Sequence, residues 1–346
     1  MSRAAFDVNV FWMYTVLLHI AGSIVFSLMG MLSLGSMLCL TALWGFFLHT
    51  SDKSRRTMGI ALCGWLVTGG LLLVMPVSYG SSLLMNLLML VFVHAVCQQR
   101  QMTLWEYSGF RRIPARQWVL LLVLTIAFLW IASYINAISM LFVQNRTAAS
   151  LEGAGQYLLQ SVLVFAVFPA VAEEILFRGY IFRSIENKNM AVILSALMFA
   201  LLHMNFNQMS YAFVMGLLFA VVVRETGNLS VSVVIHLLFN SYNIFVAAFP
   251  DSAVFRTLQE IQIAGYRPLA PSFQSASGGC DWRMLAVGSV VTCFVVLLTV
   301  YLLYLLKKTE GEKEEREKGL PWKPDQSFWG GCLVCLVVAV SYELVG

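Results

Sequence analysis

The stretch WVLLLVLTIAFLWIASYINAISML, residues 118–141, contains no charged side chain and is far longer than a strand of a membrane β-barrel. An α-helix of about 20 apolar residues is long enough to cross the hydrocarbon core of a bilayer. Apolar runs of this kind recur along the whole chain, separated by short polar segments. The sequence therefore predicts an all-α fold, a polytopic bundle of transmembrane helices.

The overall composition supports the same fold class. Of the 346 residues, 59% are hydrophobic and 12% are charged, and the mean hydropathy is +0.78. Soluble domains are typically about 45–50% apolar and about 25% charged, so a soluble globular protein is excluded. The net charge of +4 is small for a chain of this length. We expect a lipid bilayer as the environment of the chain and no nucleic-acid partner.

The apolar runs predict about 11 spans. The first two form one continuous run, which we divide near Gly30 because it has about twice the length that one span needs. The eighth is short for a span. The predicted spans lie near residues 9–29, 31–49, 58–76, 81–97, 118–141, 156–184, 189–206, 209–223, 229–248, 284–306 and 328–345.

The distribution of Lys and Arg predicts the orientation. With these spans, 18 of the 22 basic residues fall on one face of the bundle. Cytoplasmic segments are enriched in Lys and Arg, so this face is predicted to be cytoplasmic. The N-terminus then lies in the cytoplasm and the C-terminus outside. The first apolar stretch is too long for the core of a signal peptide, and we interpret it as a retained span.

Three regions follow from this pattern. Residues 1–117 form an N-terminal transmembrane region with a basic interfacial segment, and residues 118–250 form a central group of spans. Residues 251–346 comprise an outside loop and two further spans joined by a charged linker. The absence of a recognisable targeting signal favours a bacterial plasma membrane.

Ionisable side chains inside spans are costly and usually functional. The stretch AEEILFRG, residues 172–179, has three of them, Glu173, Glu174 and Arg178. Residues four apart share a face of a helix, so Glu174 and Arg178 are predicted to pair. Glu173 points about 100° away, on the face of Phe177 and Pro169, and is left for chemistry. For its carboxylate to reach the later histidines, this helix must continue to about Ile185.

Two later spans have histidines at helical spacing. Phe199 and His203 are four apart in one span, and His236 and Asn240 are four apart in another. Together with Glu173, these side chains could converge in the core of the bundle. A carboxylate, two imidazoles and an amide are groups that can activate a nucleophile and stabilise an oxyanion.

Other chemically active residue types are interpreted as structural. His19, His49 and His94 lie in spans without a neighbouring carboxylate, and a lone histidine in a membrane helix often serves as a hydrogen-bond donor. Cys332 and Cys335 have CxxC spacing, but no second pair accompanies them, so we expect packing residues.

The ordered set Glu173-Glu174-x-x-x-Arg178, Phe199-x-x-x-His203 and His236-x-x-x-Asn240 resembles the CPBP family of intramembrane glutamic endopeptidases. This family includes CAAX proteases and bacteriocin-immunity (ABI-type) proteins. The resemblance covers residues 115–250 approximately and implies a protease core there. It implies a membrane-embedded or lipid-anchored protein or peptide as substrate.

A mechanism without a cofactor is expected. Burial in an apolar bundle makes a carboxylate a stronger base, so Glu173 is predicted to activate water, with His203 holding the water. His236 and Asn240 would donate hydrogen bonds to the oxyanion. Glu174, Arg178 and Phe199 are predicted supporting residues.

Other functions fit some of these residues. Glu173, His203 and His236 also match the ligand set of some catalytic zinc sites, although HExxH is absent. A zinc-dependent protease is therefore an alternative. Intramembrane Glu, Arg and His also build proton relays, which leaves a proton-coupled transporter open, but no matching halves are found. A non-catalytic membrane scaffold is a third alternative, and the intact motif set disfavours it.

Overall fold

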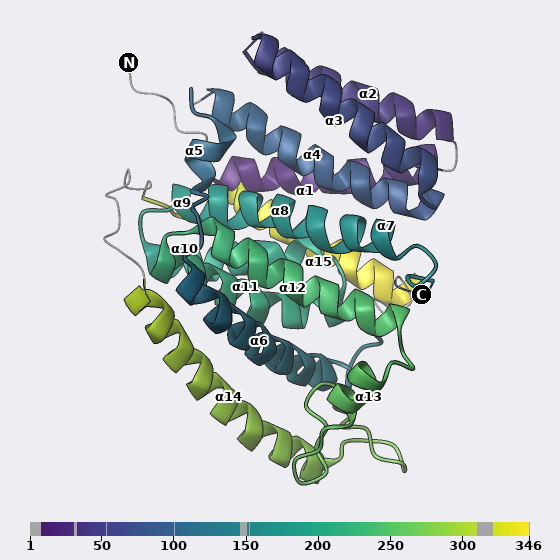
Figure 1. The fold of residues 1–346 in the computed structure, drawn as a ribbon, viewed down its shortest axis with the longest axis vertical. Helices are drawn as coiled ribbons and strands as arrows, with labels where there is room; N and C mark the ends of the chain where they lie inside the picture. Colours follow the sequence, from purple (N-terminus) through teal and green to yellow (C-terminus); the bar gives the residue numbers. More distant parts are fainter. Residues whose placement is uncertain are drawn as a thin grey trace.

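A computed structural model describes residues 8–30, 33–52, 54–99, 101–145, 151, 153–309 and 321–345. The described chain is helical, in agreement with the predicted fold class (Figure 1). The helices are α1 (Val8–Gly30), α2 (Ser33–Thr50), α3 (Arg55–Val74), α4 (Val77–Gln99), α5 (Leu104–Ser108), η1 (Ala115–Gln117), α6 (Trp118–Ser139), α7 (Leu158–Val162), η3 (Leu163–Val167), α8 (Phe168–Glu174), η4 (Ile175–Ile181), α9 (Phe182–Ser184), α10 (Lys188–Leu202), α11 (Phe206–Thr226), α12 (Leu229–Ala248), α13 (Ala253–Glu260), α14 (Trp282–Thr309) and α15 (Gln326–Val345).

The predicted spans correspond closely to these helices. Nine helical segments of the described chain are long and apolar enough to cross a membrane, and α2 and α10 are shorter apolar helices at the second and seventh predicted spans. The chain is a multi-pass integral membrane protein. The first apolar run is divided as predicted, because α1 ends at Gly30 and α2 begins at Ser33.

Two predicted boundaries are wrong around residue 205. The seventh span was expected to continue to residue 206, but α10 ends at Leu202. The eighth was expected to be short, but α11 has 21 residues. Met204 has a left-handed backbone with φ 49°, and the Asn205 side chain accepts a hydrogen bond from the Gln208 amide, which starts α11. A turn therefore replaces the expected end of one span and beginning of the next.

The segment Leu158–Ser184 is helical throughout, although it changes type along its length. Five consecutive elements, α7, η3, α8, η4 and α9, follow one another without a break, and η3 and η4 are π-helical. The helix thus continues through the residues after Glu174, as predicted from the need for Glu173 to reach the later histidines. Short π-helical turns within α-helices are frequent at functional sites.

The long helices lie side by side around the segment 158–184 (Figure 1). The α2–α3 hairpin packs on α4, and α4 packs on α8, which is covered on another side by α12. Beyond α12, α6 contacts both α11 and α14, so α14 is the outer helix of that side. The N-terminal helices and the central helices therefore flank the same segment.

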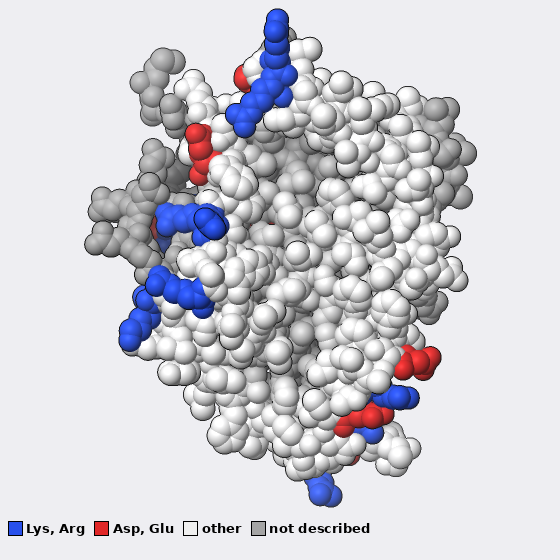
Figure 2. All heavy atoms as spheres, viewed as in Figure 1, with Lys and Arg blue, Asp and Glu red and all other residues white. Residues whose placement is uncertain are grey.

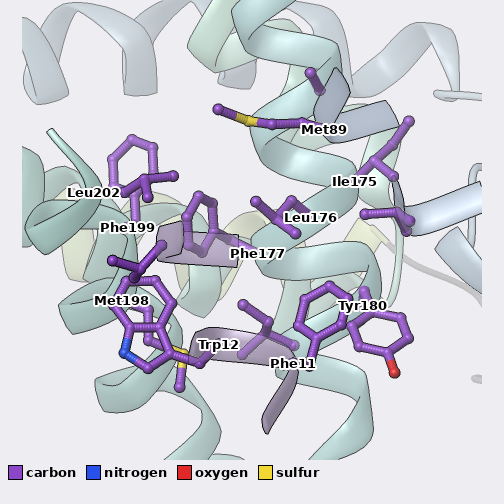
Figure 3. Packing of buried hydrophobic residues seen from close by; sticks show 14 of the residues in the cluster. Phe11, Trp12, Met89, Ile175, Leu176, Phe177, Tyr180, Met198, Phe199 and Leu202 are labelled. Atoms are coloured by element: carbon purple, nitrogen blue, oxygen red, sulfur yellow. The ribbon is translucent and has the colours of Figure 1, made fainter. Parts of the chain in front are cut away.

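One hydrophobic cluster joins all three predicted regions. It includes Phe11 of α1, Phe177 of η4 and Phe328 of α15, each almost completely buried. Figure 3 shows Phe11 beside Tyr180 and Trp12 beside Met198, and the Phe11 and Tyr180 ring centroids lie 4.2 Å apart. Packing of α1 against η4 and α10 fixes the N-terminal region to the central helices.

The surface is consistent with a bilayer environment. On the face seen in Figure 2, the charged side chains gather at the edges, and the broad middle has almost none. Many helices have exposed large apolar side chains, for example Leu62, Val119 and Phe294. Exposed apolar surface of this extent is typical of contact with lipid.

Candidate active site

Glu174, the last residue of α8, lies at the centre of a buried polar cluster. Its side chain is fully buried, and Oε1 accepts a hydrogen bond from Arg178 Nη1 at 2.8 Å. Oε1 also accepts from His236 Nδ1 at 3.1 Å, and Oε2 accepts from the Ser232 hydroxyl. The predicted pair of Glu174 and Arg178 is therefore present, with two further donors from α12. Three donors satisfy a buried carboxylate that would otherwise be costly.

Arg178 is fully buried as well, and its surroundings account for this. Besides Glu174, it donates through Nη2 to the Gly216 carbonyl at 3.0 Å. The guanidinium carbon lies 4.5 Å from the Phe199 ring centroid and 5.3 Å from that of Phe219. An ion pair, a backbone acceptor and two aromatic faces together offset the loss of hydration.

Gly216 permits this arrangement because α10 and α11 approach closely at that point. A Cβ at this position would lie 2.9 Å from the Ala196 Cα. A larger residue would push the helices apart and would move the carbonyl that Arg178 uses. The glycine of α11 is therefore part of the support for the buried pair.

Glu173 lies on another side of the same helix and has a different environment. Its side chain is 19% exposed, compared with 0% for Glu174, and Oε2 lies 3.7 Å from His236 Nε2. Pro169 lines the same cavity as Glu173, as predicted from the shared face. Phe177, predicted on this face too, instead packs against Phe199 in the core, because the π-helical turn after Glu174 changes the spacing.

The His236 ring lies between the two carboxylates. Its Nδ1 contacts Glu174 and its Nε2 faces Glu173, while the ring stacks on Phe219 with centroids 4.8 Å apart and planes at 23°. A carboxylate can only accept, so Nδ1 is the donor to Glu174. In the neutral ring, Nε2 is then an acceptor directed towards Glu173.

His203 follows α10 directly and lies in the turn, not within the helix as expected. Its backbone amide bonds to the Ala200 carbonyl, so the Phe199 carbonyl loses its usual helical partner. The His203 Nδ1 donates to that carbonyl at 2.8 Å, and this bond orients the ring. Glu173, His236 and Arg178 all lie within electrostatic range of His203.

Asn240 lies one turn after His236 on α12 and is half-buried. Among the described residues it makes no hydrogen bond, in contrast with Asn243, whose Nδ2 donates to the Phe239 carbonyl at 3.1 Å. The structure thus brings Glu173, His203 and His236 near one another and leaves the Asn240 amide uncommitted.

A cavity of about 290 Å³ lies beside Glu173. His203, His236 and Asn240 do not line it. Its walls come from the segment 163–173 and from α1 and α4, which the sequence analysis did not connect with the site. The lining residues are His19, Ser23, Ser27, Ser81, Ser82, Met85, Asn86, Met89, Val164, Phe165, Pro169 and Glu173.

Two of the three histidines that were interpreted as structural, His94 and His19, can be compared with that prediction. His94 fits the prediction, since its Nε2 makes a 2.7 Å hydrogen bond with the Ser51 hydroxyl. His19 does not, because its Nδ1 is buried without a hydrogen-bond partner among the described residues, and the side chain lines the cavity. The helical spacing of His19, Ser23 and Ser27 could have indicated this polar face.

The two cysteines with CxxC spacing do not contribute to the site. Cys332 and Cys335 are buried free thiols in the hydrophobic cluster, as expected for packing residues.

In the part of the chain that the structure describes, no group of three His, Cys, Asp or Glu side chains is arranged to hold a metal ion. The zinc alternative remains a prediction to be tested in solution.

Comparison with known proteins agrees with the family resemblance. No curated protein and no solved structure matches the chain. A match to a membrane protease family covers the helices from α7 to most of α12, and therefore includes all of the motif residues. Residues 155–242 match the family described as type II CAAX prenyl endopeptidase Rce1-like, which confirms the predicted resemblance over this segment.

Proposed function

We propose that the chain is an intramembrane endopeptidase in which Glu173 activates a water molecule for attack on a peptide bond. The observation that carries this proposal is the difference between the two adjacent glutamates. Glu174 is neutralised by Arg178 and fully buried, whereas Glu173 faces a cavity with no Arg or Lys among its lining residues. Glu173 is therefore the carboxylate available for proton transfer.

His203 is proposed to hold the attacking water. Its Nδ1 is committed to the Phe199 carbonyl, so Nε2 of the neutral ring is an acceptor. Glu173 lies within electrostatic range of this histidine. A water that donates one hydrogen to Glu173 and the other to His203 would present its oxygen lone pair for attack.

Glu173 takes one proton from the water as the oxygen attacks the carbonyl carbon, and a tetrahedral intermediate forms. The Asn240 amide is proposed to donate to its oxyanion. His236 Nε2 lies 3.7 Å from Glu173 Oε2 and can share the transferred proton, which would make it a second donor. When the C–N bond breaks, the same proton passes to the leaving nitrogen, and both Glu173 and His236 return to their starting state.

The substrate is proposed to be a membrane-embedded or lipid-anchored protein or peptide, since the site lies on transmembrane helices. The family match favours such a substrate and gives no sequence for it. That the membrane is a bacterial plasma membrane stays a prediction.

Cleavage of a quenched library of membrane peptides by the purified protein tests this proposal. We expect turnover by the unsubstituted protein and none above background by Glu173→Ala, with both proteins equally folded. Proton-coupled flux without cleavage would contradict the proposal and favour a transporter. Neither activity in the unsubstituted protein, with every class of membrane peptide, would favour the non-catalytic scaffold.

A further inference from the structure

The wall of the cavity opposite Glu173 is polar, although it is built by the N-terminal helices. On α1, His19, Ser23 and Ser27 are spaced four apart and all line the cavity. Residues at this spacing lie above one another on one side of a helix, about 6 Å apart along its axis. They form a polar stripe about 12 Å long.

The other side of α1 is apolar, in contrast with this polar stripe. Ile24, Val25 and Leu28 are exposed on the outer side, as expected for a helix in contact with lipid. Thr15 is also polar, but its hydroxyl donates to the Phe11 carbonyl at 2.9 Å, which satisfies it within the helix. Among the described residues, no such bond is made by Ser23 or Ser27.

The part of the wall that α4 contributes, next to α1, is polar too. Ser81, Ser82 and Asn86 line the cavity, and the Asn86 amide donates to the Ser82 carbonyl at 2.8 Å. Two helices thus place a histidine, an asparagine and four serines around one space beside Glu173. Among these side chains, the His19 Nδ1 is buried without a hydrogen-bond partner in the described part of the chain. It requires water or a polar ligand, because an unpaired buried polar group costs free energy.

We propose that this cavity is the path by which water reaches Glu173. The inference rests on the proposed function and deepens it, because hydrolysis consumes one water for each peptide bond. About 290 Å³ has room for several waters, since one water occupies about 30 Å³ of the liquid. The lining offers hydroxyl, amide and imidazole groups and only one carboxylate, which suits neutral water better than a cation.

His19 is assigned the inner end of this path. Its Nδ1 is buried without a hydrogen-bond partner among the described residues, and it lies within electrostatic range of His203. A water bound to His19 satisfies that nitrogen and is placed in the cavity that Glu173 borders. His19 is a positioning residue in this account, since it acts on the water supply and not on the peptide bond.

The outer end lies near Ser27 and Ser81. These residues are close to the end of α1 and the beginning of α4, and both line the cavity. The basic segment after α4 is at the other end of that helix. Water therefore enters from the side opposite the predicted cytoplasmic face.

Cysteine labelling tests the path without any measurement of proteolysis. Ser23→Cys and Ser27→Cys are placed in the full-length protein in membranes, and a charged, membrane-impermeant thiol reagent is added on both sides. Val25→Cys and Leu28→Cys are matched controls on the lipid-facing side of α1. Peptide mass spectrometry measures modification at each position, so the native cysteines do not interfere.

Only a hydrated thiol ionises and reacts with such a reagent. We expect the two cavity positions to react on the order of tenfold faster than the two lipid-facing positions, because ionisation needs water. Reagent added from the outer side alone should give the same result. Equal rates at all four positions, or reaction only from the cytoplasmic side, would overturn the proposal.

A kinetic experiment tests His19. His19→Phe should lower kcat on the order of tenfold with KM unchanged, and His19→Gln should restore part of it, because the amide can still bind water. A change in KM with unchanged kcat would overturn the positioning role. If no variant and no unsubstituted protein cleaves any peptide, the proposed function fails, while the labelling result still decides whether the path is hydrated.

Discussion

The two sides of α8 differ more than their adjacent glutamates suggest. On one side, Glu174 is fully buried and accepts from Arg178, His236 and Ser232. On the other, Glu173 is 19% exposed and borders a polar cavity. One helix thus holds one carboxylate in a buried ion pair and leaves its neighbour beside a cavity. In the proposed mechanism, this difference makes Glu173 the base and Glu174 a supporting residue.

Among the substitutions that test this difference between Glu174 and Glu173, Arg178→Ala is expected to have the largest effect. The substitution leaves Glu174 buried without its cation, and breaking a buried pair typically costs about 3–5 kcal/mol. We expect the free energy of unfolding in detergent to fall by that amount and cleavage to be lost with it.

Arg256→Ala is the control, because Arg256 is exposed on α13. It should change the unfolding free energy by no more than about 0.5 kcal/mol. A stable and fully active Arg178→Ala protein would show that the pair does not support the position of Glu173.

Asn240→Ala tests the group of residues around Glu173, where chemistry is proposed. Loss of one oxyanion donor typically lowers kcat by about 10²–10³. We expect that fall in the cleavage rate with little change in KM, because the donor acts on the transition state. Asn243→Ala is matched in composition and lies on the same helix, but its amide is bonded to the Phe239 carbonyl. Equal activity losses in the two variants would remove Asn240 from the mechanism.

Ser232→Ala should have a smaller effect and should act on stability. The hydroxyl donates to Glu174 Oε2, and a hydrogen bond to a charged group contributes about 1.5–3 kcal/mol. We expect the unfolding free energy to fall in that range while kcat stays within a few-fold. Ser341→Ala is the control, since that hydroxyl is exposed and bonds only to a backbone carbonyl. A large kcat effect without a stability effect would place Ser232 on the reacting side.

Chelation should have the smallest effect. In the proposed mechanism Glu173 acts on water directly, so exhaustive treatment with EDTA or phenanthroline should leave the cleavage rate unchanged. Loss of activity that returns on addition of zinc would support the metalloprotease alternative, with Glu173, His203 and His236 as ligands.

The spacing of residues along the sequence predicted the interactions that lie within a single helix. The pair of Glu174 and Arg178 lies within one turn of one helix, so the sequence could predict it. The order and approximate limits of the spans were also predictable, because length and apolar composition determine them. The family match over residues 155–242 includes the three motifs that can be read directly from the sequence.

The rest depends on how separate helices meet, which spacing cannot show. The end of α10 at Leu202 results from the turn at Met204 and Asn205, and it places His203 outside the helix. Ser232 reaches Glu174 only because α12 packs against α8. The proposed role of His19 also requires α1 to lie beside the cavity. The spacing of His19, Ser23 and Ser27 marks a polar face of α1, but the contact of that face with the cavity has no signature within a single helix.

The most direct test of the account is Glu173→Gln, assayed for cleavage and for unfolding free energy in the same preparation. Glutamine keeps the size and polarity of the side chain and removes only its ability to accept a proton. Loss of a general base typically lowers the rate by about 10²–10⁴. The account predicts that loss with the unfolding free energy unchanged within about 0.5 kcal/mol. Cleavage within threefold of the unsubstituted protein would contradict the assignment of Glu173 as the base.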